Sequence, residues 1–382
     1  MNTTEPTENS DLGLVLSGGG ARAAYQVGVL SAIAERMPNL SVPIHSGVSA
    51  GAINTITLAS FPGSFSAATR ALRRGWSKLT VESVYRVRMS GWVRAGFRWL
   101  GQRTLGRAPG PTVLRGLLDL DPLREYMQRQ LDFDHIGEKV TTGKLRAVTL
   151  SATCYGSGET VTFVQCSEDV PMWERSQRVS IRSKLTMDHL IATASIPIMF
   201  PAVRIGKGFY GDGSVRQAAP LAPAIHAGAN RLLAIGMRPK WDAVAPLPGT
   251  MRYPSAAQVM GMLFHAVFLD SLDSDAERLE RINAILRAIP AGMPTSGDLR
   301  PIKLLLLRPS LDLGALARPH WRRLPRIMRS MVQSIGGQRE GASDFVSYLL
   351  FDPAYTGPLM ELGYDDANDQ WEKIEEFLGD GG

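Results

Sequence analysis

The stretch LGLVLSGGGAR at residues 12–22 decides the fold. Its first five residues are almost entirely apolar, which is the pattern of a short β-strand buried on both faces. Three consecutive glycines follow at 18–20, and apolar residues then recur at helical spacing from Ala23 to Ala34. The stretch therefore predicts a buried strand, a glycine loop and a helix in direct succession.

A second unit of the same kind comes next along the chain. Residues 42–48 are predicted as a strand and 50–60 as a helix, with the small-residue turn GVSAG between them. Further strands are predicted at 145–153, 160–165, 231–237 and 302–307, and helical stretches at 188–195 and 259–289. This alternation predicts an α/β fold with a mainly parallel central sheet.

Composition sets the class of protein. The chain has 382 residues, 44% of them hydrophobic and 20% charged, which is typical of a globular enzyme and excludes a disordered or fibrous chain. The two cysteines, Cys154 and Cys166, provide neither a disulfide framework nor a metal-ligand spacing. Residues 1–11 are polar and lack the features of a signal peptide, and no apolar run approaches roughly 18 residues. We therefore expect a cytoplasmic protein.

The turn GVSAG at 47–51 carries the first chemical signal. It fits the nucleophile elbow, in which a serine lies on a tight turn between a strand and a helix. Gly47 and Gly51 fit such a turn because residues without bulk let the strand and the helix approach each other closely. The alternative is that Ser49 is only a helix N-cap, although an N-cap does not require a glycine on each side.

The glycine loop supplies a second requirement of acyl transfer. Attack on an ester builds negative charge on oxygen, and backbone N–H groups at a helix N-terminus stabilise that charge by roughly 2.7 to 4 kcal/mol per donor. A nucleotide-binding loop is the alternative interpretation of three glycines after a first strand. It is disfavoured because neither Gly-x-x-x-x-Gly-Lys-Ser/Thr nor Gly-x-Gly-x-x-Gly occurs here.

A serine nucleophile also needs a base. None of the six histidines stands in a glycine-rich turn, and each is more typical of a surface or helix residue. Asp212, in the sequence YGDGS, lies between two glycines that can present it to a cleft, although an Asp in such a turn is often only a turn residue. A triad that uses His226, His265 or His320 remains open at this point.

Together these segments resemble the patatin-like phospholipase family over about residues 12–236, with ATASIPIMFP at 192–201 as a further match. The resemblance implies a three-layer α/β/α sandwich and a Ser-Asp dyad, with Ser49 as nucleophile and Asp212 as base. It also implies an oxyanion hole of Gly18, Gly19 and Gly20, with Arg22 at the family's basic position, and neither cofactor nor metal. One departure is Ala23, where the family commonly has glycine.

The resemblance, the charge distribution and the length of the stretch after Pro239 together set the expected domains and activity. We expect a flexible N-terminus at 1–11, a catalytic domain at 12–238 with a basic insertion at about 70–110, and a mostly helical extension at 239–382. The extension is expected to contribute the strand near 302–307, a lid and an acidic tail. The substrate class implied is phospholipids or lysophospholipids. Alternatives are a thioesterase or acyltransferase on the same fold, or a catalytically silent membrane-binding scaffold.

The net charge of +6 is concentrated in one segment. Residues 70–107 hold ten Lys or Arg and one acidic residue, whereas the remaining chain holds 32 basic and 35 acidic residues. Interleaved tryptophans favour peripheral contact with an anionic membrane, at its inner face. The alternative is a solvated basic face whose aromatic residues pack on the core. Nucleic acid is not an expected partner, because no recognised motif accompanies the charge.

Overall fold

The computed structural model describes residues 11–87, 116–239, 253–290, 299–334 and 342–379. The strands in these ranges are β1 (Leu12–Leu16), β2 (Ile44–Gly47), β3 (Arg86–Val87), β4 (Leu118–Asp119), β5 (Ala147–Cys154), β6 (Thr160–Cys166), β7 (Glu174–Arg175), β8 (Arg178–Arg182), β9 (Val203–Ile205), β10 (Gly208–Asp212), β11 (Arg231–Ile235) and β12 (Lys303–Leu307). The α-helices are α1 (Ala24–Arg36), α2 (Ala50–Ser60), α3 (Phe65–Lys78), α4 (Val81–Val84), α6 (Asp121–Gln128), α7 (Asp134–Thr141), α8 (Met187–Thr193), α9 (Ala222–His226), α10 (Ala256–Phe268), α11 (Asp270–Ala288), α12 (Leu313–Ala317), α13 (Arg326–Ser334), α14 (Ala342–Leu349), α15 (Pro353–Asp369) and α16 (Trp371–Gly379). Three 3-10 helices are described, η1 (Gly20–Ala23), η2 (Gly213–Val215) and η3 (Arg318–Arg323).

A single mixed sheet forms the centre of the molecule. Its main strand order is β12-β11-β1-β2-β5-β6-β8-β7, and the first five of these strands are parallel. Strand β6 returns antiparallel to β5, and β10 pairs antiparallel with the carboxyl end of β5. The predicted mainly parallel sheet is confirmed.

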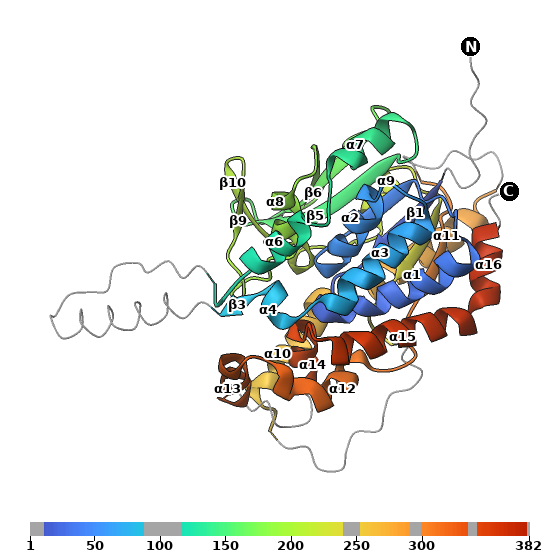
Figure 1. Ribbon diagram of the computed structural model, residues 1–382. Coiled ribbons are helices and arrows are strands. Elements are labelled where there is room, and N and C mark those ends of the chain that lie inside the picture. The colour runs from blue at the N-terminus through green and yellow to red at the C-terminus, as the bar shows by residue number, and fades with distance from the viewer. Residues whose placement is uncertain (1–10, 88–115, 240–252, 291–298, 335–341, 380–382) are drawn as a thin grey trace.

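Helices cover both faces of this sheet. In β1, Leu12, Leu14 and Leu16 join the large core cluster that also contains residues of α1, α2 and α3. Val15 points the other way, into a second core cluster with residues of α9 and α11. Because successive side chains of a strand point to opposite faces, the two clusters define the three layers of an α/β/α sandwich (Figure 1).

The described residues after 239 are built into the same fold. Strand β12 extends the sheet beside β11, which confirms the strand predicted at 302–307. Helix α15 lies along α1 (Figure 1), and the backbones approach so closely that a Cβ at Gly28 would lie 2.8 Å from the Tyr364 nitrogen. A Cβ at Gly363 would lie 3.0 Å from the Val29 nitrogen. Glycines on both helices therefore permit this packing.

Several elements differ from the sequence-based expectations. The helical stretch predicted at 259–289 is two helices, α10 and α11, which meet at Leu269. Residues 203–212, where no strand is predicted, form the β9–β10 hairpin. Strand β8, with the sequence RVSIR, is not predicted either, because it is short and has an arginine at each end. Cys154 and Cys166 are the last residues of β5 and β6 and are half-buried.

The basic segment lies partly within the described residues. Helix α3 exposes Arg70, Arg74 and Lys78 at i, i+4 and i+8, whereas Trp76 is 2% exposed and donates to the Asn54 side chain at 2.7 Å. In this part of the segment the aromatic side chain therefore packs on the core while the basic side chains face solvent, which both interpretations allow. The predictions for residues 1–10 and 88–115 concern residues outside the described ranges. Among the described helices, none is long and apolar enough to cross a membrane.

Candidate active site

Ser49 lies at the turn between β2 and α2. The parallel register pairs Leu16 with Gly47, and the Val48 nitrogen donates to the Leu16 carbonyl oxygen at 3.3 Å. Ser49 itself has φ 54° and ψ −132°, a backbone conformation that residues other than glycine rarely adopt. A Cβ at Gly51 would lie 2.5 Å from the Ser17 carbonyl oxygen. The turn therefore has the strain and the close backbone approach expected of a nucleophile elbow.

Ser49 is held by neighbours outside its own turn. Its backbone nitrogen donates to Thr193 Oγ1 at 3.0 Å, and Thr193 Oγ1 in turn donates to the Ser151 carbonyl oxygen. The Ser49 side chain makes no capping hydrogen bond to α2 within the described structure. The hydroxyl is thus left for another role, which disfavours the N-cap interpretation.

Asp212 is the last residue of β10 and lies across the sheet from Ala152 on β5. Its backbone nitrogen donates to the Ser195 carbonyl oxygen at 2.8 Å, and its Oδ1 accepts from the Ser214 nitrogen at 2.9 Å. The residue is completely buried. One carboxylate oxygen therefore caps the short helix η2, in agreement with the turn interpretation, while the other oxygen is directed elsewhere.

The Asp212 carboxyl approaches the Ser49 side chain. Burial raises the pKa of the Asp212 carboxyl to about 7, while hydrogen bonding from the side chains of Ser49 and Ser214 and from the Ser214 backbone lowers it. Among the described residues Oδ2 has no partner with full hydrogen-bond geometry. The contact with Ser49 is therefore a close approach that can tighten when substrate binds. A carboxyl with a pKa near 7 is suited to general-base catalysis near neutral pH.

The glycine loop, residues 17–20, lies against the same serine. A Cβ at Gly18 would lie 2.9 Å from the Ser49 Cβ, and Gly20 has φ +57°. No described residue accepts a hydrogen bond from the backbone N–H groups of Gly18, Gly19 or Gly20. Since buried backbone donors are normally paired, three unpaired donors beside a serine indicate a site for an anionic oxygen.

The Arg22 side chain does not accompany these amides. Its guanidinium, only 1% exposed, donates to Ser347 Oγ at 2.7 Å and to Asp344 Oδ1 at 3.0 Å. It also lies 3.2 Å from His265 Nε2 and 4.5 Å from the centre of the Tyr348 ring. The basic position implied by the family resemblance thus contacts the carboxyl-terminal helices in this structure, rather than the space above the glycine loop.

Helices α10 and α14, which we call the cover, close the site. A Cβ at Gly18 would lie 3.5 Å from the Phe268 ring, and one at Gly20 would strike the Tyr348 backbone. The two helices are joined by ring contacts of Phe264 with Phe345 and Tyr348, at centroid distances of 5.2 and 5.3 Å. As a result Ser49 is only 2% exposed.

The histidines left open by the sequence lie elsewhere. His265 contacts Arg22 and pairs with Asp344 at 3.2 Å, and His226 stacks on the Trp173 ring. His320 lies on the surface helix η3. No described contact links any of the three to Ser49, so the geometry favours Asp212 as its partner.

Sequence reasoning missed the residues that support the pair. Thr193 positions the Ser49 backbone and Ser214 holds one oxygen of Asp212. Thr193 belongs to the stretch 192–201 that carried the family resemblance, so a signal for it existed in the chain. Asp344 and Ser347, by contrast, lie more than 320 residues from Arg22, and their polar side chains gave no local sign of that contact.

A mainly parallel sheet that presents a strained serine at a strand-to-helix turn, next to free backbone donors, is an arrangement typical of α/β hydrolases. The model of the family described as patatin-like phospholipase matches residues 14–225, more than half of the chain. The chain belongs to the patatin-like phospholipase family. Membership in this family supports hydrolase activity on lipid esters.

Two solved structures are similar to the chain at low identity. Human GIVD cytosolic phospholipase A2, bound to methyl gamma-linolenyl fluorophosphonate and terbium chloride, is 14% identical, with all of this chain and 60% of that chain covered and a TM-score of 0.44. VipD from Legionella pneumophila is 12% identical, with 97% of this chain and 69% of VipD covered and a TM-score of 0.34. The chain thus spans about 60% of the human phospholipase. No curated protein matches the chain.

Proposed function

We propose that this protein hydrolyses carboxylic esters of phospholipids or lysophospholipids through a Ser49–Asp212 dyad. One observation carries the proposal. Ser49 has a strained backbone and a side chain that does not cap α2, and it lies beside the buried Asp212 carboxyl, whose pKa is about 7. The backbone N–H groups of Gly18, Gly19 and Gly20 serve as the oxyanion hole.

The reaction follows from this geometry. Asp212 takes the Ser49 hydroxyl proton as Oγ bonds to the ester carbonyl carbon, and the carbonyl π electrons move to the oxygen beside the glycine amides. The tetrahedral intermediate collapses, the bond to the alcohol breaks, and the alcohol leaves with the proton. Asp212 then deprotonates water, which releases the fatty acid from Ser49 by the same path.

The central test replaces Ser49. Ser49→Ala should lower ester hydrolysis by on the order of 10⁵-fold or more, and a fluorophosphonate probe should no longer label the protein. Ser31→Ala, which changes a half-buried serine on α1 whose hydroxyl donates to the Val27 carbonyl oxygen, is the matched control and should retain both activity and labelling. Full hydrolysis by Ser49→Ala would contradict the proposal.

The same experiment separates the alternatives. A thioesterase or acyltransferase would also react with the probe, but it would prefer a thioester, or would transfer the acyl group to an added alcohol faster than to water. A silent scaffold would bind lipid vesicles without any labelling of Ser49. We favour the phospholipid hydrolase because the chain belongs to a phospholipase family.

We also propose that the cover is a lid. Support comes from the nearly complete burial of Ser49 beneath α10 and α14, which leaves a lipid no access unless these helices move. Amide hydrogen exchange in 256–268 and 342–349 should accelerate when anionic phospholipid vesicles are added. Helix α15, which packs tightly on α1, is the internal control and should not change. Unchanged exchange in the cover would rule out the lid.

A further inference from the structure

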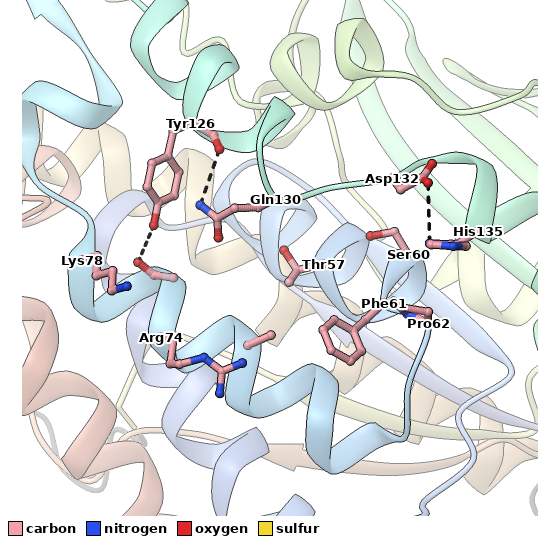
Figure 2. A pocket seen from close by; sticks show the side chains of 12 residues that line it. Thr57, Ser60, Phe61, Pro62, Arg74, Lys78, Tyr126, Gln130, Asp132 and His135 are labelled. Carbon is pink, nitrogen blue, oxygen red and sulfur yellow. Dashed lines mark hydrogen bonds and ion pairs between the residues drawn. The ribbon is translucent and has the colours of Figure 1, made fainter.

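Three cavities lie in sequence along one face of α2. An inner chamber of about 30 Å³ borders Ser49 and Ile53, and a slot of about 20 Å³ borders Ile53 and Thr57. An outer cavity of about 470 Å³ borders Thr57 and Ser60 and opens between α2, α3, α6 and the residues that lead into α7 (Figure 2). Positions 49, 53, 57 and 60 recur every three or four residues, so they share one face of the helix.

Neighbouring cavities also share lining residues from the opposite wall. Leu123 lines both the inner chamber and the slot. Gly75 and Tyr126 line both the slot and the outer cavity. The three spaces are therefore adjacent in the order chamber, slot, outer cavity, and together they lead from the nucleophile to the surface.

The character of the walls changes along this line. The inner chamber is lined by Leu123 and Phe200 and the slot by Leu72, Trp76 and Met127, all apolar. Gln130 lies where the slot meets the outer cavity, and the outer cavity itself presents the charged side chains of Arg74, Lys78 and Asp132 (Figure 2). An apolar path that begins at Ser49 and ends among charged groups fits a hydrocarbon tail of limited length.

From these observations we propose that the acyl chain of the substrate runs from Ser49 along α2, through the inner chamber and the slot, toward the outer cavity. This inference rests on the proposed function, because it requires an acyl group at Ser49. The chamber and slot are narrow in this closed structure, so the tail enters by displacing the side chains that line them. Leu72, Leu123 and Met127 are suited to this, since Leu and Met have several rotatable bonds and Met adapts readily to irregular space.

The helix provides a ruler for the tail. With a rise of about 1.5 Å per residue, Ile53 lies about 6 Å and Thr57 about 12 Å along α2 from Ser49. An all-trans chain advances about 1.25 Å per carbon, given bonds of about 1.5 Å and near-tetrahedral angles. Tails of up to about ten carbons therefore stay within apolar walls, and longer tails reach the polar outer cavity.

Two substitutions at different depths test the path. Ile53→Phe narrows it near the nucleophile, and Gly75→Leu narrows it where the slot meets the outer cavity. Gly75 has room for a side chain, because its Cβ would lie 3.2 Å from Gln130 Oε1 and 3.9 Å from Tyr126 Oη, both ends of flexible groups. Gly137→Leu is the matched control, a half-buried helix glycine that lines none of the three cavities.

The measurement is kcat/KM on p-nitrophenyl esters from two to sixteen carbons. Ile53→Phe should lose at least about tenfold on chains of eight or more carbons and change less than about threefold on acetate and butyrate. Gly75→Leu should lose a similar factor only on chains of twelve or more carbons, and Gly137→Leu should follow the wild type. Thermal unfolding of each variant identifies a misfolded protein, and if Ile53→Phe is misfolded then Gly75→Leu decides.

The outcomes separate the two proposals. Suppose that ester hydrolysis depends on Ser49, but that Ile53→Phe and Gly75→Leu either lower kcat/KM equally at every chain length or do not lower it at all. This result would overturn the acyl path and leave the proposed function standing. Hydrolysis that does not depend on Ser49 would overturn the proposed function itself. A loss that begins at shorter acyl chains in Ile53→Phe than in Gly75→Leu would establish the path.

Discussion

The floor and the cover of the candidate site are built by different means. The floor consists of the glycine loop, the elbow and Asp212, and backbone hydrogen bonds of the central sheet position each of them. The cover meets the floor through the buried side chain of Arg22, which follows the glycine loop and contacts Ser347, Asp344 and the Tyr348 ring. A backbone framework fixes the reacting groups, whereas a small set of side chains holds the helices that exclude solvent from them.

This difference follows from what each part must do. The register that pairs Leu16 with Gly47 brings Gly18 beside Ser49, so the proposed oxyanion donors and the nucleophile have a fixed relation. Fixed donors cost no reorganisation during reaction. A lid must instead exchange its contacts for others, and a few buried polar contacts can be broken together without unfolding the sheet.

The largest expected effect concerns the floor. Asp212→Asn preserves the hydrogen bond from the Ser214 nitrogen but removes the base, so kcat should fall by about 10²- to 10⁴-fold. In the wild type kcat/KM should fall about tenfold per pH unit below an apparent pKa of about 7, because protonated Asp212 cannot accept the Ser49 proton. A pH profile that is flat from pH 5 to 8 would contradict this role.

The same substitution should stabilise the protein. Because burial raises the pKa of Asp212 to about 7, the folded state binds more protons than the unfolded state between pH 4 and 7, and stability falls as pH rises through that window. Above pH 7 Asp212→Asn should therefore gain roughly 2 to 4 kcal/mol in unfolding free energy, since one pKa unit corresponds to about 1.4 kcal/mol. Denaturant titrations at pH 4.5 and pH 8 measure the gain, which should vanish at the lower pH.

The floor was predictable from sequence because its signals are local. Apolar strands, glycines at fixed offsets and an acidic residue between glycines are physical requirements of a strand-loop-helix turn, and they occupy short stretches around residues 18, 49 and 212. Their encounter in space depended on the family resemblance rather than on any pattern. The strained φ of Ser49 and the raised pKa of Asp212 could not be predicted from the sequence, because both depend on the three-dimensional surroundings of these residues.

The cover was not predictable in the same way. The expected lid was placed only by the length of the stretch after Pro239, and nothing in the sequence around Asp344 or Ser347 indicates a partner more than 320 residues away. Polar residues on a helix usually face solvent, so their contact with a buried Arg22 runs against the general rule. Long-range contacts between single side chains leave no periodic trace in a sequence.

A double-mutant cycle on Arg22→Met and Asp344→Asn tests how strongly the cover is attached. Methionine retains much of the apolar stem of arginine, so the cycle isolates the charged contact. We expect a coupling free energy of about 1 to 3 kcal/mol from denaturant unfolding, because Arg22 is buried. The exposed pair Arg281–Glu277 on α11 is the control and should give at most about 0.5 kcal/mol. Equal coupling free energies for the two pairs would mean that the Arg22–Asp344 contact holds the cover no more strongly than an exposed ion pair would.

The smallest effect concerns lipid contact away from the cover. We propose that the basic face of α3 adds attraction to an anionic membrane, since Arg70, Arg74 and Lys78 lie exposed on one side of the helix. Arg70→Gln combined with Lys78→Gln should weaken binding to phosphatidylserine vesicles by about 2 kcal/mol at low salt, at about 1 kcal/mol per charge. Hydrolysis of a monomeric acetate or butyrate ester should not change, because neither residue touches the floor and so short an acyl chain does not reach Lys78 in the outer cavity. The effect should disappear at high salt, where surface charges are screened.

The control is Arg281→Gln, which removes an exposed arginine on α11 and should leave vesicle binding unchanged. An equal loss of binding in this control would show that the total charge matters and that the position of α3 does not.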